Sequence, residues 1–178
     1  MKICIINSGG TIACVGDPLA PMSAEAFADN SRRLLDPVML AMFPDLELHW
    51  DTGLAFPESQ NGMLDSTNLQ PRDWCRVADH ILQLYDRFDG CVLLHGTDSM
   101  DFTGSALPFL LNACDRDGRG QALLSKPVIL TGSQVPLYQR GGYQRGEPDT
   151  LRFNTDAFQN LCGAIACARQ LIPEVCVY

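Results

Sequence analysis

The chain contains 178 residues, of which 46% are hydrophobic and 19% are charged, and its net charge is −8. This length suits one domain with a substantial buried core. An acidic balance argues against a nucleic-acid-binding face, which needs clustered lysine and arginine. No apolar run is long enough to cross a membrane, and the first one breaks at Asn7, too early for a signal peptide. We therefore expect a soluble, cytoplasmic protein with neither nucleic acid nor membrane as a partner.

The eight cysteines do not predict a metal or redox site. No two of them are spaced as C-x-x-C, and most lie in apolar runs, where a free cysteine behaves as a small hydrophobic residue. The turn Ser8-Gly9-Gly10-Thr11 matches neither G-x-x-x-x-G-K nor G-x-G-x-x-G, the patterns of phosphate-binding loops. We therefore expect no metal and no cofactor.

The first part of the chain alternates between predicted strands and helices. Residues 2–7 are apolar and predict a central parallel strand. The glycine- and proline-rich residues 14–21 predict a mobile loop, and a helix is expected over 24–35, interrupted or restarted at Pro37. Residues 46–50 alternate between apolar and polar side chains, as a second strand does.

The alternation continues to the end of the sequence. A long polar loop over 52–66 leads to a helix whose apolar residues recur at helical spacing from Trp74 to Phe88, and a strand at 91–95 follows at once. The remaining expected elements are a helix near 101–113, a polar turn at 115–120, a strand at 127–131, a flexible loop at 138–150, a helix at 158–168 and a strand at 175–178. Strands joined to helices in this order predict a parallel sheet covered by helices. We expect a single doubly wound α/β domain of Rossmann or flavodoxin type, with a mainly parallel sheet, over residues 1–178.

Two of these strands end in turns that carry hydroxyl groups. The strand at 2–7 leads to Thr11, and the strand at 91–95 leads to Thr97 and Asp98. Ligands of open α/β sheets bind just beyond the carboxyl ends of the strands. A threonine there can attack an acyl carbon, and Asp98 could orient or deprotonate Thr97 or bind a substrate ammonium group. The structural alternatives are that Thr11 satisfies backbone groups in a tight turn and that Asp98 caps the next helix.

Two further polar groups have both a functional and a structural interpretation. Ser59-Gln60-Asn61 lies in the long loop and could hold a substrate carboxylate and amine, although solvent-facing loop residues have the same composition. His95 ends its strand, where a hydrogen-bonded structural histidine is a better interpretation than a catalytic base.

Four segments, in order, resemble motifs of the bacterial-type L-asparaginases. Asn7-Ser8-Gly9-Gly10-Thr11-Ile12-Ala13 is similar to their T-G-G-T-I-A signature, with Ser8 in place of the usual threonine. The second segment, His95-Gly96-Thr97-Asp98-Ser99-Met100, is similar to their H-G-T-D-T-M motif. The third runs from Lys126 to Pro136 and is similar to K-P-V-x-x-T-G-S-Q-x-P of the cytoplasmic type. The fourth, Asp156-Ala157-Phe158-Gln159-Asn160-Leu161, is similar to D-G-x-x-N-L. The resemblance covers essentially the whole chain and only the N-terminal domain of the family.

This resemblance implies an amidohydrolase that converts L-asparagine to L-aspartate and ammonia through a threonine acyl-enzyme. By its motif, Thr11 would be the nucleophile. Thr97 and Asp98 would be the second hydroxyl and its carboxylate, with Asp98 also facing the substrate amino group. Ser59 and Gln60 match the loop pair that holds the α-carboxylate and the amine.

The resemblance also implies how the rest of the substrate is held. Backbone N–H groups near Thr97 and Thr11 would stabilise the oxyanion of acyl transfer. Gly10, Gly96 and Ser133 are expected to contact the substrate.

Three parts of the family's machinery have no match within this chain: the C-terminal domain, the catalytic lysine and the loop tyrosine that activates the nucleophile. The lysine would follow a strand corresponding to 174–178, and Lys126 belongs to a different motif. Residues 14–30 contain no tyrosine, which leaves Tyr138 and Tyr143 in another candidate loop. We expect a homodimer or homotetramer in which a neighbouring copy completes the site.

Two alternative functions remain compatible with the residues. The chain could bind asparagine or aspartate without catalysis, or it could be one subunit of a larger amidotransferase. The sequence does not separate asparagine from glutamine as substrate, because a pocket discriminates one methylene by only about 1–3 kcal/mol.

Overall fold

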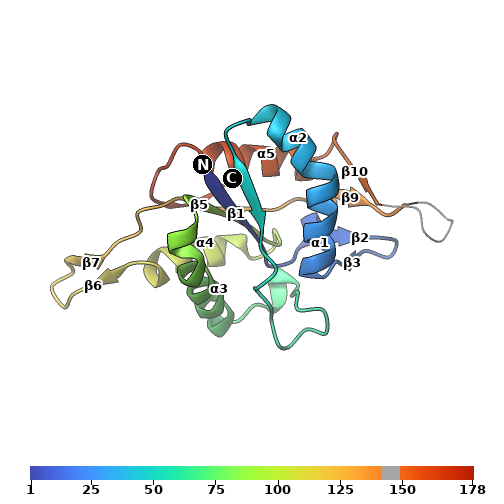
Figure 1. The fold of residues 1–178 in the computed structure, drawn as a ribbon. Coiled ribbons are helices and arrows are strands. Elements are labelled where there is room, and N and C mark those ends of the chain that lie inside the picture. The colour runs from blue at the N-terminus through green and yellow to red at the C-terminus, as the bar shows by residue number, and fades with distance from the viewer. Residues whose placement is uncertain (142–148) are drawn as a thin grey trace.

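The computed structural model describes residues 1–141 and 149–178, and its centre is a five-stranded sheet in which every neighbouring pair is parallel (Figure 1). The strands, in spatial order, are β11 (Val175–Val177), β8 (Val128–Thr131), β5 (Gly90–Leu94), β1 (Lys2–Asn7) and β4 (Glu47–Trp50). This is the order of a doubly wound, flavodoxin-type sheet. The predicted fold class is therefore confirmed.

Three of the five described helices begin where the sequence supplies a capping group. Ser23 accepts a hydrogen bond from the Ala26 N–H, and the Asp73 carboxylate accepts one from the Gln70 N–H; both groups would otherwise be unpaired at a helix start. Thr155 does the same for the last helix through the Phe158 N–H. The helices are α1 (Ala24–Asn30), α2 (Asp36–Met42), α3 (Pro71–Leu84), α4 (Met100–Leu110) and α5 (Asp156–Ala168).

Two helix predictions need correction. The helix expected over 24–35 consists of α1 and a π-helical turn at Ser31–Leu35, and α2 then follows without a break. Pro37 stands in the first turn of α2, where its missing N–H costs no helical hydrogen bond, so it restarts the helix. The helix expected near 101–113 ends at Leu110, because the chain turns there into a short hairpin.

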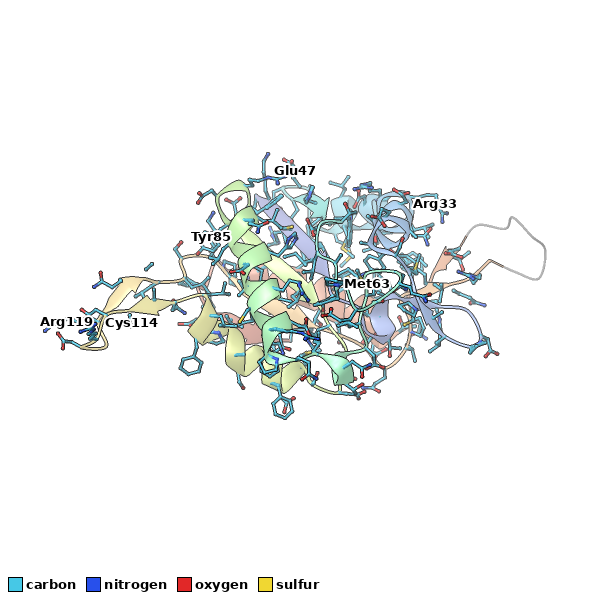
Figure 2. All side chains as sticks on the ribbon, turned by 90° about the horizontal axis from the view of Figure 1, so that it is seen from below. Arg33, Glu47, Met63, Tyr85, Cys114 and Arg119 are labelled. Carbon is cyan, nitrogen blue, oxygen red and sulfur yellow. The ribbon has the colours of Figure 1, made fainter. Side chains whose placement is uncertain are left out.

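Three hairpins occupy segments that the sequence predicts as loops or turns. The predicted mobile loop at 14–21 forms the antiparallel pair β2 (Cys14–Val15) and β3 (Ala20–Pro21). The polar turn after α4 joins β6 (Ala113–Cys114) to β7 (Gly120–Ala122), a hairpin that projects from the body of the molecule (Figure 2). In the predicted loop at 138–150, β9 (Tyr138–Gln139) pairs with β10 (Thr150–Leu151).

The sheet separates two hydrophobic cores. The helices α3 and α4 pack on one face through residues such as Ile81 and Leu107, which are fully buried. On the other face, α1, α2 and α5 pack through residues such as Phe27, Met39 and Ile165. A strand buried on both faces is apolar along its whole length, which explains the continuous apolar runs in the sequence.

One crossover departs from the usual hand. Both β5–α4–β8 and β8–α5–β11 move one strand in the same direction along the sheet, yet α4 and α5 lie on opposite faces. These two connections therefore have opposite hands. The connections through α1–α2, α3 and α4 share one hand, so β8–α5–β11 is the exception to the right-handed rule that about 98% of such units obey. As a result, α5 approaches the end of β8 from the α1 face.

All eight cysteines are free thiols. Within the two described stretches, no helix is long and apolar enough to span a membrane.

Candidate functional site

The carboxyl ends of β1 and β5 form the topological switch point of the sheet. From β1 the chain crosses to β4 on one side, whereas β5 lies on the other side, and ligand sites of open α/β sheets form where the order reverses in this way. Both turns predicted to carry chemistry, after Asn7 and after Leu94, begin at this point. The topology therefore brings Thr11 and Thr97 to the same edge of the sheet.

The two turns are in direct backbone contact. The amide and the hydroxyl of Ser8 both donate to the Leu94 carbonyl, at 3.0 Å and 2.7 Å. Gly10 has a φ of +85°, and a Cβ atom there would lie 2.5 Å from the Gly96 nitrogen. Only glycine permits both this dihedral angle and this approach. The close approach of Gly10 to Gly96 thus holds the two turns together, and the expected contact of both glycines with substrate stays a prediction.

The candidate catalytic side chains are open at this edge. Thr11 is half-buried at the start of a 3₁₀ turn (Thr11–Ala13), whereas Thr97 and Asp98 are exposed. The Thr97 hydroxyl accepts a hydrogen bond from Gln134 at 3.1 Å. In the described part of the chain, neither the Thr11 hydroxyl nor the Asp98 carboxylate forms a hydrogen bond. Ser99 is the N-cap residue of α4, so the structural alternative for Asp98, helix capping, is wrong.

A third turn, which follows β8, is held by α5. The Asp156 carboxylate accepts hydrogen bonds from the Gln134 and Val135 N–H groups, at 2.6 Å and 3.4 Å. One turn further along α5, the Asn160 amide donates to the Gly132 carbonyl at 2.9 Å. These two contacts explain the spacing of the D-x-x-x-N segment. They place Gln134 against Thr97.

Ser133 lies in the same turn but does not present a free hydroxyl. Its side chain is 2% exposed, and its Oγ donates to the Val135 carbonyl at 2.5 Å. Its expected contact with substrate stays a prediction, and only its backbone is left for such a role.

Ser66 is a site residue that the sequence reasoning missed. It is buried against Gly96, where a Cβ atom would collide with the Ser66 hydroxyl, and its carbonyl accepts a hydrogen bond from Ser99 at 2.6 Å. Asp65 precedes it and caps a short 3₁₀ turn through the Thr67 N–H at 3.0 Å. The sequence signal that could have indicated Ser66 is the run Asp65-Ser66-Thr67, which is typical of an Asx-capped turn and lies shortly before the helix that begins at Pro71.

Ser59 and Gln60 lie elsewhere in the same loop. The Ser59 hydroxyl donates to Asn61 at 2.7 Å, and Asn61 donates to the Pro21 carbonyl at 3.1 Å, so this turn is attached to the β2–β3 hairpin. Gln60 is exposed. No hydrogen bond among the described residues joins Ser59 or Gln60 to the turns at Gly10 and Gly96. Their substrate-binding role stays a prediction, and Ser66 is the loop residue that the fold places in the site.

His95 supports the site from beneath. Its Nδ1 lies 2.7 Å from the Gly96 carbonyl, which can only accept, so Nδ1 carries the proton. The Thr103 hydroxyl therefore donates to Nε2, at 2.8 Å. Burial lowers the pKa of His95 below its ordinary value, outweighing the opposing hydrogen bond to Gly96. The interpretation of His95 as a hydrogen-bonded residue at a strand end is confirmed.

Tyr138 and Lys126 lie away from the described site. Tyr138 is 1% exposed, its hydroxyl is paired with Ser31 at 2.7 Å, and burial raises its pKa, so it is not a mobile activating tyrosine. Tyr143 lies outside the described residues. Lys126 precedes β8, at the opposite end of the sheet, and its ammonium group lies over the Tyr85 ring.

Replacing Gly10 by alanine is expected to destabilise the fold by more than the cost of the positive φ angle alone. A Cβ atom would collide with the Gly96 backbone, which cannot move without displacing β5. We expect the free energy of unfolding in urea to fall by about 3 kcal/mol or more, the sum of overpacking and backbone strain. Gly118 is a matched control, because it has a φ of +77° and nothing within 4 Å. Equal losses for Gly10→Ala and Gly118→Ala would contradict the contact.

The neutral state of His95 predicts a pH dependence of stability. Because the pKa is lowered in the folded state, the unfolded chain binds a proton that the folded chain rejects, so stability falls as the pH drops below about 6.5. One such group contributes a slope of at most about 1.4 kcal/mol per pH unit. We expect the slope between about pH 7.5 and pH 5.5, about one unit either side of an ordinary histidine pKa, to be smaller in His95→Gln. Identical slopes in the two proteins would show that His95 titrates normally.

Comparisons with known proteins agree with this geometry. A family model described as "Asparaginase, N-terminal" matches residues 2–178. L-asparaginase 1 of Escherichia coli is 34% identical over 136 residues, which are 76% of this chain and 35% of that protein. The L-asparaginase of Thermococcus kodakarensis is 30% identical over 177 residues, covering 99% of this chain and 43% of that protein.

Two further proteins, one of them a solved structure, are similar to nearly the whole of this chain. A solved structure of a thermostable L-asparaginase from Thermococcus kodakarensis superposes with a TM-score of 0.66 and 28% identity, over 99% of this chain and 43% of the other. A component of the glutamyl-tRNA(Gln) amidotransferase of Archaeoglobus fulgidus is 27% identical over 97% of this chain and 33% of that protein. The chain spans less than half the length of each of these proteins. With its fold, its paired threonine turns and this match over nearly its whole length, the chain belongs to the asparaginase N-terminal family.

Proposed function

We propose that this chain hydrolyses L-asparagine to L-aspartate and ammonia through an acyl-enzyme on Thr11. The observation that carries the proposal is the backbone contact of Gly10 with Gly96, which brings the Thr11 turn beside the Thr97–Asp98 turn. The names of the E. coli and T. kodakarensis relatives support asparagine as the substrate. Hydrolysis of an amide by a hydroxyl nucleophile needs a second polar group nearby that accepts and donates protons. The Thr97–Asp98 turn supplies such a group beside Thr11.

The chemistry assigns one role to each turn. The Thr11 oxygen attacks the side-chain carboxamide carbon and loses its proton. The amide nitrogen takes up a proton and leaves as ammonia, and water then hydrolyses the ester. Thr97 and Asp98 would bind and orient the groups that carry the protons, with Asp98 also facing the substrate ammonium group. The free hydroxyl of Thr11 and the free carboxylate of Asp98 support these roles, because neither side chain is engaged elsewhere among the described residues.

The remaining substrate groups need donors at the same edge of the sheet. Backbone N–H groups of the two glycine turns would stabilise the oxyanion, as acyl transfer requires. Ser66, buried against Gly96, is the hydroxyl best placed to bind the substrate carboxylate from the loop side. We add Ser66 to the candidate substrate-binding residues on this basis.

Ammonia release tests the proposal. We expect the intact protein to release ammonia from L-asparagine, and faster than from L-glutamine. Thr11→Ala should lower the rate by about 10³-fold or more, the order of magnitude by which removing a nucleophile slows a hydrolase. The control is Ser125→Ala, which removes an exposed hydroxyl next to Lys126, at the end of the sheet opposite the site, and should leave the rate unchanged.

The outcomes separate the candidate functions. Binding of L-asparagine in a calorimeter without ammonia release would indicate a binding domain. Activity that appears only together with a copurifying second chain would favour one component of an amidotransferase, a role that the name of the A. fulgidus relative also suggests. Full activity in Thr11→Ala would remove Thr11 as the nucleophile.

We also propose that the protein works as a homodimer or homotetramer in the cytoplasm. Thr97 and Asp98 are exposed at an open edge, which a second copy could close. Helix α4 exposes two aromatic rings two turns apart, Phe102 at 59% and Phe109 at 84%, and rings on one face of a helix favour burial against protein. The free state of all the cysteines is typical of a reducing compartment.

Sedimentation velocity at the assay concentration checks the assembly. We expect a dimer or tetramer that Phe109→Asp shifts towards monomer, because a charge would be buried in the contact. Leu40→Asp is the control, since Leu40 is 52% exposed on the outer side of α2. A protein that is fully active as a monomer would contradict this proposal.

A further inference from the structure

A second group of chemically reactive side chains lies on the α3 face of the sheet, in strands β1 and β4. The structure brings together one atom each from Cys4, His49 and Asp51, all within 4.8 Å of one another. It is the one group of three such residues found among residues 1–141 and 149–178. None of them takes part in the proposed hydrolysis.

The sheet itself creates this proximity. Cys4 and His49 are register partners on adjacent parallel strands, so their side chains stand next to each other on one face. Asp51 follows His49 by two residues, the interval at which side chains return to the same face. Its N–H still bonds to the Ile5 carbonyl, so the backbone continues the strand up to this residue.

The site is enclosed, but it leaves ligand atoms unused. Cys4 is 0% and Asp51 is 8% exposed. All described hydrogen bonds to Asp51 go to Oδ2: from Gly53 at 3.0 Å, from Leu54 at 3.2 Å and from His80 at 2.7 Å. The other carboxylate oxygen accepts none from the residues that the structure describes. The same holds for the His49 ring nitrogens, although the ring lies 4.9 Å from that of Phe88.

The surroundings of Asp51 fix its carboxylate from the Oδ2 side. The Nε2 atom of His80 lies 2.7 Å from Oδ2, and the amides of Gly53 and Leu54 donate to the same oxygen. This arrangement, in which a second residue fixes the orientation of an acidic ligand, is typical of the outer shell of metal sites.

We propose that Cys4, His49 and Asp51 bind one Zn²⁺ ion, with a water molecule in the fourth position. Sulfur, imidazole nitrogen and carboxylate oxygen are together a zinc ligand set, whereas magnesium and calcium take oxygen alone. Ligand atoms around tetrahedral zinc lie about 3.5 Å apart, so side-chain movements of about 1 Å would close the group. A thiolate and a carboxylate balance the charge of the ion.

Binding exchanges a proton for the metal at Cys4. Without metal the thiol keeps its proton, since the hydrogen bond with Cys91 and then burial raise its pKa. When zinc binds, the S–H bond breaks, the proton leaves to solvent and the sulfur lone pair forms the bond to zinc. A cavity of about 440 Å³ is lined by Gly53 and His80, which both form hydrogen bonds with Asp51.

The ion would brace the loop that leads to the candidate active site. Asp51 begins the segment whose far end carries Ser66, packed against Gly96. Zinc would tie the start of this segment to β1 and β4. Its role is therefore to support this loop, and none of the three ligands takes part in the proposed hydrolysis.

Calorimetric titration of chelator-treated protein with Zn²⁺ tests the site. We expect binding of one ion per chain, with the affinity lowered more than about 100-fold in Cys4→Ser and in His49→Gln. His80→Gln, which changes only the support of Asp51, should cost about 10–100-fold. Cys75→Ser is the control, because Cys75 is an exposed thiol on α3 and should leave the affinity unchanged.

Two further readouts make the result independent of folding. Co²⁺ should give a thiolate-to-metal charge-transfer absorption in the intact protein and not in Cys4→Ser. If the buried Cys4→Ser variant fails to fold, His49→Gln, whose ring is half-buried, carries the test, with circular dichroism confirming its fold. No zinc binding by the intact protein, or equal affinity in His49→Gln, would overturn the proposal and leave a polar network that closes the end of β4.

Discussion

The close approach of two backbone turns, at Gly10 and Gly96, is the constraint on which the candidate site depends. β1 and β5 are adjacent parallel strands, so their ends already lie about 5 Å apart, but a side chain on Gly10 would force the turns to separate, and one on Gly96 would collide with Ser66. Because neither glycine has one, Thr11 and Thr97 are delivered to one place. The fold thereby combines two hydroxyls that are 86 positions apart in the chain.

The other strand ends supply support. The loop after β4 returns to the switch point and lays Ser66 against Gly96, and the turn after β8 lays Gln134 against Thr97. The β8 turn is held by Asp156 and Asn160 of α5. That support depends on the unusual hand of the last crossover, which puts α5 on the face opposite α4. A right-handed connection would have put α5 beside α4, on the other side of the sheet.

The division between what was predicted and what was missed at the site follows from the range of each interaction. Thr11, Thr97 and Asp98 were found because a strand followed at once by a glycine turn is a local pattern. Ser66 was missed because its position depends on how a 15-residue loop, 52–66, returns to the sheet, and Ser59-Gln60 offered the same kinds of side chain in that loop. The sequence predicts loops where the strand pairs β2–β3 and β9–β10 lie, because strands of two residues carry too few side chains to show a period.

The sequence by itself determined the alternation of strands and helices, the parallel sheet and the two threonine turns, because apolar periodicity and glycine turns are properties of neighbouring residues. Only the tertiary structure decided the hand of the last crossover, the place of Ser66 and the grouping of Cys4 with His49 and Asp51. Those residues meet across strand pairings whose partners lie dozens of positions apart. No local pattern encodes such a pairing. It is fixed by the packing of the helices on the two faces of the whole sheet.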